Sequence, residues 1–258
     1  MVDAMPARTA ATASIDDAEI ARFEAVAARW WDSEGEFRPL HRLNPVRVGF
    51  IRDRLCTDFD RAPTEPTPLA GLAIADVGCG GGLLCEPMAR LGARVTGIDA
   101  GDEAVAVARL HAEQAGLAID YRAATAETLA AEGRRFDAVL ALEIVEHVAD
   151  VDAFLGAVAA LVRPGGTLIM STLNRTPKSF GLAILGAEYV LRWVPRGTHD
   201  WRKFVRPSEL AAGLRRHGIA TEALSGMVFN PLANTWRLAE TDLDVNYLLA
   251  GRKAGDKG

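Results

Sequence analysis

A run of glycines that follows an acid is the feature of the sequence with the clearest chemistry. The segment Asp76-Val77-Gly78-Cys79-Gly80-Gly81-Gly82 comes after a short apolar run and before a helical pattern. These neighbours predict the first strand-to-helix turn of a parallel sheet, where ligands bind, and glycines there let a ligand approach the backbone. Read as the dinucleotide fingerprint G-x-G-x-x-G from Gly78, the run has Leu83 where the third glycine belongs. This argues against NAD.

Two acids beside this turn indicate which ligand it binds. Asp76 would repel a pyrophosphate but favour a sulfonium or an ammonium group, and S-adenosylmethionine carries both. Asp99 lies 23 residues further on, at the end of the second apolar run, where an acid accepts hydrogen bonds from ribose hydroxyls. The alternative is a flexible turn, with Asp99 at the start of a helix that begins near Asp102. The combined pattern favours S-adenosylmethionine.

A second group of polar residues, Glu143, Glu146 and His147, follows the fourth apolar run. Two carboxylates and an imidazole suit a hard divalent cation such as Mg²⁺, which would favour the deprotonated form of a phenol bound to it. Without a metal, His147 would be the general base. A third interpretation makes these residues ordinary loop and helix-start residues before Asp150 caps the next helix.

Short apolar runs alternate with helical patterns from residue 69 onward. This alternation predicts a Rossmann-like α/β domain over 69–258, with a mostly parallel seven-stranded sheet and helices on both faces. The strands are expected at 73–77, 94–98, 119–122, 138–142, 167–171, 219–224 and 245–250. Helices are expected at 84–91, 103–115, 126–131, 151–162 and 207–216. An insert, 173–204, follows the fifth strand.

The first 68 residues precede this domain. We expect a disordered start over 1–14, for which a poor transit peptide is the alternative. Residues 15–68 predict a helical extension that ends in a Pro-rich linker. Its first helix carries apolar residues at helical spacing up to Trp31. Its second should begin with Asn44 as N-cap and Pro45 in the first helical position.

The composition limits the class of protein. With 258 residues, 49% of them hydrophobic, the chain can bury a full core. A formal net charge of -5 gives no general attraction for phosphate backbones, so nucleic acid is not an expected partner. Cys56, Cys79 and Cys85 show no CxxC spacing and follow no secretory segment, which favours the reducing cytoplasm.

Several segments outside the glycine run resemble one family. The chain is similar to class I methyltransferases and, from about residue 15 to 250, resembles the ubiquinone-biosynthesis O-methyltransferases. The segments that carry this resemblance are 23–32, 37–45, 143–147, 171–175, 186–189 and 197–200. The resemblance implies transfer of the S-adenosylmethionine methyl group to a phenolic hydroxyl of a polyprenylated catechol and of demethylubiquinol. It also implies Mg²⁺ dependence through the Glu-x-x-Glu-His pattern.

The resemblance further implies that Arg47, Gly78, Asp99 and Leu142 contact the cofactor, and we expect Gly80 of the same turn there too. Arg47 could form a charge-assisted hydrogen bond with the methionine carboxylate, although a solvated arginine is the ordinary alternative. No acid follows the third strand, where Ala124-Thr125-Ala126 stands. We therefore expect apolar contacts to hold the adenine.

Other functions remain open from the residues. The chain lacks the Asn/Asp-Pro-Pro-aromatic motif of methyltransferases that act on bases, since Leu142-Glu143-Ile144-Val145 stands there. A methyltransferase for another small aromatic acceptor, or a non-catalytic S-adenosylmethionine-binding scaffold, are the alternatives. His199 and Asp200 form a reserve candidate for the base.

The insert predicts contact with a membrane. Residues 178–193 are mostly apolar with cations at both ends, but sixteen residues fall short of the roughly 20 that span a bilayer. The cations expected at anionic headgroups are Arg175, Lys178, Arg192, Arg196, Arg202 and Lys203. The apolar residues expected in the interface are Phe180, Leu185, Tyr189 and Trp193. A buried lid helix is the alternative. We expect a cytoplasmic protein, peripheral at the inner membrane face, with enzymes of the same pathway as further partners.

Overall fold

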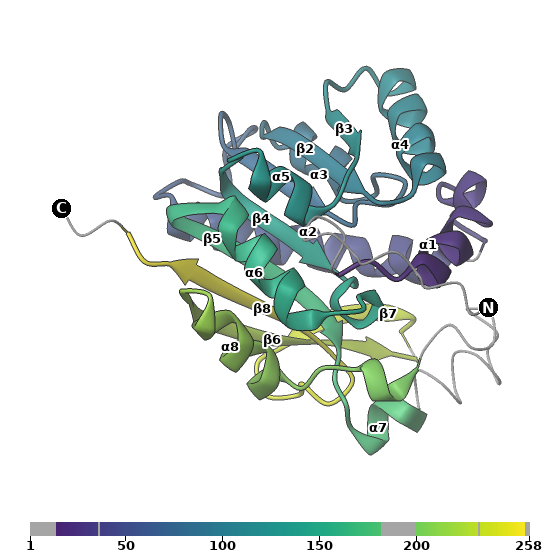
Figure 1. Ribbon diagram of the computed structural model, residues 1–258, viewed down its shortest axis with the longest axis vertical. Coiled ribbons are helices and arrows are strands. Elements are labelled where there is room, and N and C mark those ends of the chain that lie inside the picture. The colour runs from purple at the N-terminus through teal and green to yellow at the C-terminus, as the bar shows by residue number, and fades with distance from the viewer. Residues whose placement is uncertain (1–13, 36, 182–199, 232, 256–258) are drawn as a thin grey trace, which may run out of the picture.

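The computed structural model describes residues 14–35, 37–181, 200–231 and 233–255. An eight-stranded sheet in the order β3-β2-β1-β4-β5-β8-β6-β7 forms the centre of this part of the chain (Figure 1). The strands are β1 (Ala73–Val77), β2 (Arg94–Asp99), β3 (Asp120–Ala123), β4 (Phe136–Leu142), β5 (Val162–Leu173), β6 (Ile219–Asn230), β7 (Thr235–Ala239) and β8 (Asn246–Lys253). β1 to β5 run parallel, and β8, β6 and β7 complete the sheet in antiparallel pairs.

Helices cover both faces of the sheet. They are α1 (Asp17–Glu24), α2 (Arg38–Asp58), α3 (Cys85–Arg90), α4 (Asp102–Gln114), α5 (Ala126–Ala131), α6 (Val151–Leu161), α7 (Pro177–Ser179) and α8 (Pro207–Arg216). Single 3₁₀ turns lie at η2 (Ala27–Arg29), η3 (Val145–His147) and η5 (Trp201–Lys203). The predicted Rossmann-like α/β fold is confirmed, with one strand more than the seven expected.

The additional strand is β7, which pairs with β6 at the edge of the sheet. Most of its residues are exposed, so it lacks the apolar alternation by which the other strands were predicted. Trp236 and Ala239 are its half-buried residues, and Trp236 lies near Phe229 of β6, with ring centroids 5.3 Å apart. An edge strand that is held mainly by backbone bonds leaves little hydrophobic signal in a sequence.

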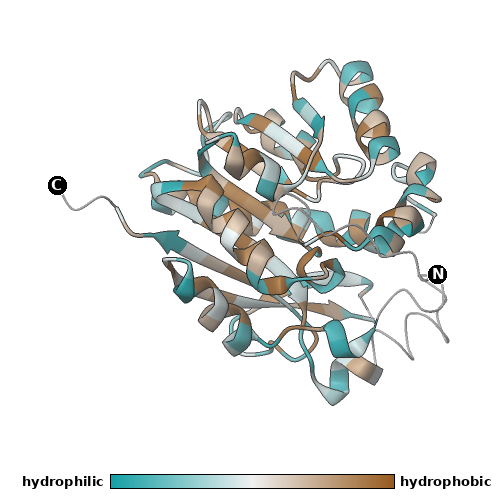
Figure 2. Ribbon diagram, in the orientation of Figure 1, coloured by the Kyte–Doolittle hydropathy of each residue, from teal (hydrophilic) through white to brown (hydrophobic). Residues whose placement is uncertain are grey.

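Two cores lie on opposite faces of the sheet. Along β4, Ala138, Leu140 and Leu142 belong to the core under α2, α3 and α4, whereas Val139 and Ala141 belong to the core under α5, α6 and α8. This alternation follows from the pleat of the strand. Figure 2 shows the hydrophobic residues concentrated in the central strands and on the helix faces that turn toward them. The sheet is therefore buried on both faces, as parallel sheets require.

The N-terminal extension differs from its prediction at two places. The first helix is broken into α1 and η2. The second, α2, begins at Arg38 and runs through Pro45, so Asn44 is not its N-cap. Pro45 lacks the N–H that would bond the carbonyl of His41, at a cost of about 3 kcal/mol inside a helix. The burial of Ile51, Leu55 and other side chains along this 21-residue helix offsets that cost.

The start of the described chain is anchored on the domain. Ser14, placed by prediction in a disordered segment, is buried, and its hydroxyl donates a hydrogen bond to Glu127. Its carbonyl accepts a hydrogen bond from the Ala149 amide at 2.8 Å. Residues 1–13 of that segment lie outside the described residues. Within the described ranges, no helix combines the length and the apolar character needed to cross a bilayer.

Candidate active site

A cavity of about 770 Å³ opens at the carboxyl ends of the parallel strands. Its walls include all eight residues that the sequence placed at the cofactor or the metal, which are Arg47, Gly78, Gly80, Asp99, Leu142, Glu143, Glu146 and His147. The volume lies within the range of small-molecule sites. The position is the one at which open parallel sheets bind ligands.

The glycine turn is held by the end of the second strand. The amides of Gly78 and Cys79 both donate to the carbonyl of Ile98, at 2.8 and 2.9 Å. The Asp99 carboxylate accepts one hydrogen bond from the Gly80 amide and one from the Gly101 amide, each at 2.9 Å. Burial raises the pKa of Asp99, against the lowering effect of these two bonds. The turn and the acid thus form one rigid unit.

The turn requires glycine for two reasons. Gly78 and Gly80 have φ values of 73° and 50°, in the left-handed region. A Cβ on Gly78 would overlap the Ile144 side chain, and one on Gly80 would overlap the Trp30 ring. The backbone of the turn is therefore in direct contact with Ile144 and with Trp30, which belongs to a layer of aromatic side chains.

This aromatic layer comes from the N-terminal extension and was not assigned to the site from the sequence. The Trp31 indole N–H donates to the carbonyl of Gly81 at 2.9 Å, and the ring stacks on His111 with centroids 3.5 Å apart. Trp30 stacks on Phe37 at 3.8 Å. The only sequence signal was a pair of tryptophans in a helical pattern, which is more often ordinary core.

Arg47 is almost fully buried, and its charge lies near two acids of the cavity wall. Its guanidinium donates to the Asn44 amide oxygen at 3.2 Å, while its Nε has no partner among the described residues. Burial lowers the pKa of Arg47, against the charges of Glu143 and Asp76. Burial also raises the pKa of Asp76 to about 6, although Cys85 donates to it and Arg47 is near. The cavity wall thus contains the buried Arg47 guanidinium, with one N–H that has no partner, and the buried carboxyl group of Asp76.

Glu143 follows β4 directly and has a strained conformation. Its φ of 53° is in the left-handed region, which costs a residue other than glycine of order 1–3 kcal/mol. Its amide donates to the Ser171 carbonyl at 3.0 Å, and its carboxylate accepts from the Ser171 hydroxyl at 2.6 Å. These bonds keep the carboxylate at the carboxyl edge of β4 and β5.

Glu146 and His147 point to other partners. The Glu146 carboxylate accepts from the Thr172 hydroxyl at 2.8 Å, and burial, aided by the charge of Glu143, raises its pKa to about 7. His147 Nδ1 contacts the Glu19 carboxylate at 3.1 Å. Within the described ranges, no three His, Cys, Asp or Glu residues converge in a way that could hold a metal ion. The donor types suit Mg²⁺, but their placement does not gather them around one point.

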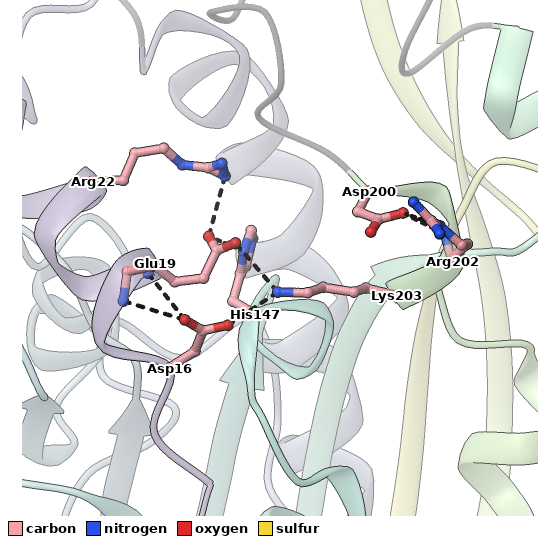
Figure 3. A network of polar contacts seen from close by, with 8 residues as sticks. Asp16, Glu19, Arg22, His147, Asp200, Arg202 and Lys203 are labelled. Carbon is pink, nitrogen blue, oxygen red and sulfur yellow. Dashed lines mark hydrogen bonds and ion pairs between the residues drawn. The ribbon is translucent and has the colours of Figure 1, made fainter. Parts of the chain in front are cut away.

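Figure 3 shows the network that connects His147 to α1 and to the end of the insert. Glu19 contacts Arg22 at 3.2 Å and Lys203 at 3.4 Å, and Lys203 also contacts Asp16 at 3.1 Å. The hydrogen bond from His147 lowers the pKa of Glu19 to about 2, against its partial burial. Burial lowers the pKa of His147, but Glu19 and the charge of Glu146 outweigh it and leave that pKa raised. An acid–imidazole pair thus forms part of the cavity wall.

The sequence did not identify Glu19, which lies 128 residues before His147. His199 and Asp200 are the reserve candidate for the general base. Asp200 contacts Arg202 at 3.3 Å, as Figure 3 shows, and accepts from the Arg202 amide at 3.0 Å. His199 lies outside the described residues. Asp200 is thus committed to capping η5.

The fold agrees with that of solved methyltransferases. Residues 75–170 match the methyltransferase domain family. Magnesium protoporphyrin IX methyltransferase from Synechocystis PCC 6803 with bound SAH has a TM-score of 0.62 at 20% identity, over 92% of this chain and 100% of that chain. The plantazolicin methyltransferase in complex with SAH has a TM-score of 0.60 at 14% identity, over 92% and 98%. Together with the family match, these likenesses show the class I methyltransferase fold.

Closer relatives define the family. The ubiquinone biosynthesis O-methyltransferase of Cereibacter sphaeroides is 55% identical over 240 residues, which is 93% of this chain and 97% of that protein. Those of Dinoroseobacter shibae and Brucella anthropi are 55% and 53% identical, over 94% of this chain and 98% of each relative. The chain belongs to the ubiquinone biosynthesis O-methyltransferase family, as its motifs indicated, and is an O-methyltransferase.

The contact between Glu19 and His147 gives a first prediction. Replacing Glu19 with Gln removes the negative charge that stabilises the imidazolium and leaves only a neutral amide oxygen as acceptor, so the pKa of His147 should fall. Titration of the imidazole by NMR, without added metal, measures this change. Asp17→Asn is the matched control because Asp17 is an exposed acid of the same helix. An unchanged His147 pKa in Glu19→Gln would show that the contact is absent in solution.

Proposed function

We propose that this chain methylates a phenolic hydroxyl of a polyprenylated catechol and of demethylubiquinol in ubiquinone biosynthesis. The name of its relatives supports the pathway. The observation that carries the proposal is the cavity itself, because the glycine turn and the Glu19–His147 pair both line it. A donor bound at the turn and an acceptor bound near the imidazole would therefore meet without crossing solvent.

The cofactor would be held by complementary charges. Each Asp99 carboxylate oxygen accepts one backbone N–H and retains lone pairs for the ribose hydroxyls. Arg47, with an unpartnered N–H, would bind the methionine carboxylate. A cationic group of the ligand beside Asp76 would favour the ionised form of the Asp76 carboxyl group. Leu142 and Ala126, both on the cavity wall, would give apolar contacts to the adenine.

The acceptor hydroxyl must lose its proton as the methyl group arrives. Glu19 occupies Nδ1 of His147 and leaves Nε2 to take that proton. The O–H bond breaks toward Nε2, the O–CH₃ bond forms, and the S–CH₃ bond breaks with its electron pair moving to sulfur. The products are the methyl ether and S-adenosylhomocysteine. The remaining requirement is the in-line arrangement of oxygen, carbon and sulfur, and a shared cavity supports this because donor and acceptor would bind in one space.

Mg²⁺ at Glu143, Glu146 and His147 is a further proposal, supported by the donor chemistry and by the burial of the Glu146 carboxylate. These side chains would have to leave Ser171, Thr172 and Glu19 to reach one ion. A bound cation would favour the phenolate form of the acceptor. No step above depends on it.

Asp99 gives the second prediction. Asp99→Ala should weaken S-adenosylmethionine binding by about 1.5–3 kcal/mol, or roughly 10- to 150-fold in Kd, because ribose hydrogen bonds to a charged group are lost. Isothermal calorimetry measures it. Asp102→Ala, an exposed acid in the first turn of the adjacent helix, should keep the affinity of the wild type. Equal affinity in a folded Asp99→Ala protein would remove Asp99 from the site.

The third prediction tests the acceptor and the metal together. Purified protein should methylate short-chain catechol and demethylubiquinol analogues. Turnover should fall in excess chelator and return with Mg²⁺, while S-adenosylmethionine binding stays constant. Product formation by mass spectrometry and cofactor affinity by calorimetry separate these effects. Full turnover in chelator would remove the Mg²⁺ proposal and leave the His147 mechanism. Cofactor binding without any product would favour a non-catalytic scaffold.

We also propose that the insert brings the enzyme to the inner membrane face, where a polyprenylated acceptor resides. Phe180 is 43% exposed and lies edge-on to Trp201 at 6.3 Å. The described cations of the insert are committed to acids, since the pairs are Arg175–Glu209, Lys178–Asp242, Lys178–Asp244, Lys203–Asp16, Lys203–Glu19 and Arg202–Asp200. Electrostatic attraction would therefore depend on Arg192 and Arg196, which lie outside the described residues.

Liposome flotation with anionic lipid gives the fourth prediction. The intact protein should float, the protein lacking residues 178–193 should not, and Arg192→Glu/Arg196→Glu should float less because it repels anionic headgroups. Arg134→Glu/Arg135→Glu, with the same charge change on another surface, is the matched control and should float like the wild type. Equal flotation of all variants would assign the insert to a lid instead.

A further inference from the structure

Asn246 begins β8 at the carboxyl edge of the sheet, and its amide oxygen Oδ1 lacks a hydrogen-bond partner. The residue is 7% exposed, and no group of the described chain bonds this atom. A buried polar atom without a partner costs about 1–3 kcal/mol, so native proteins seldom leave one without a reason. Asn246 lines the same cavity as the glycine turn.

The neighbouring polar side chains do not share this property. Ser171 donates to Glu143 and Thr172 donates to Glu146. Asn174 donates to the Leu243 carbonyl at 2.8 Å, and Tyr247 donates to the Val205 carbonyl at 3.0 Å. Each of these four side chains donates a hydrogen bond to another group of the protein. The Asn246 amide oxygen, by contrast, is buried and has no such partner in the described part of the chain.

The strand register places Asn246 at the carboxyl edge of the sheet, two strands away from β4. Asn246 pairs with Leu173 of β5, and β5 in turn pairs with β4 through Leu142 and Ser171. Because neighbouring strands lie about 4.8 Å apart, β8 is about 10 Å from β4. That spacing leaves room for one aromatic ring between a methyl donor above β4 and the amide on β8.

The surroundings of Asn246 suit a substituted ring. By the alternation along β8, Asn246 faces the same side as Leu248, whose core also contains Met227. Leu173, Met227, Val245 and Trp236 all line the cavity. Lys178 and Asp242 line the cavity as well, but they are paired with each other. An amide oxygen without a partner beside these apolar side chains fits an aromatic acceptor that presents a hydroxyl there.

We propose that Asn246 recognises the acceptor by accepting a hydrogen bond from the hydroxyl adjacent to the one that is methylated. This inference rests on the proposed function and deepens it, because it names the group that separates catechols from simple phenols. A site that bonds a substrate hydroxyl discriminates against the analogue without it, since the buried protein group then stays unpaired. Asn246 would be a specificity residue, and His147 would act on the other oxygen.

The test compares two acceptors and two buried groups. Binding of a short-chain 3-alkylcatechol, and of the 3-alkylphenol that lacks the hydroxyl beside the chain, is measured by calorimetry on the complex with S-adenosylhomocysteine. The wild type should prefer the catechol. Asn246→Leu should lose about 5- to 100-fold of that preference while keeping S-adenosylhomocysteine affinity. Thr221→Val is the matched control, because Thr221 also has an unpartnered buried hydroxyl but lies outside the cavity wall.

Each result decides the proposal. An unchanged catechol preference in Asn246→Leu, or an equal loss in Thr221→Val, would overturn it. Asn246→Ser serves as a second, smaller variant. If neither Asn246 variant binds S-adenosylhomocysteine, the residue holds the sheet edge and the proposal is wrong. A wild-type complex that binds neither compound but methylates another acceptor would overturn the proposed acceptor class itself.

Discussion

The hydrogen bonds between the glycine turn and the end of β2 are the constraint on which the site depends. Two successive amides, of Gly78 and Cys79, share the Ile98 carbonyl, and the Asp99 carboxylate takes the Gly80 amide. The turn can follow this path only with left-handed backbone at Gly78 and Gly80. The turn lies at one end of the cavity. The aromatic layer and the charged side chains of Arg47 and Asp76 are positioned relative to it.

The N-terminal extension completes the cavity without contributing to the central sheet. Trp31 donates to Gly81, and Glu19 contacts His147. α1 has no fully buried residue, so polar contacts hold much of it in place. Lys203 links the same helix to the end of the insert. The two segments that lie outside the central fold therefore meet at the imidazole that would take the acceptor proton.

Buried charge gives this cavity its chemical character. Arg47 lies near the charges of Asp76 and Glu143 at the carboxyl edge of the sheet. Burial lowers the pKa of Arg47 and raises the pKa of Asp76, which favours the neutral form of each group. Charged groups stay in such a place only when partners compensate for the lost water. In the proposed complex, S-adenosylmethionine would supply such partners to the buried Arg47 guanidinium and to the Asp76 carboxylate.

The sequence alone determined the fold class, the cofactor-type turn and the family, because each depends on local patterns. The run Asp76–Gly82, the acid at Asp99 and the alternation of strands and helices are readable from neighbours in the chain. Only the tertiary structure decided which distant groups meet. Glu19 and His147 are 128 residues apart, and Asn246 reaches the cavity through antiparallel pairing with β5. Tertiary packing likewise overrode the N-cap predicted at Asn44 and added the edge strand β7, since burial and backbone pairing there outweigh local preference.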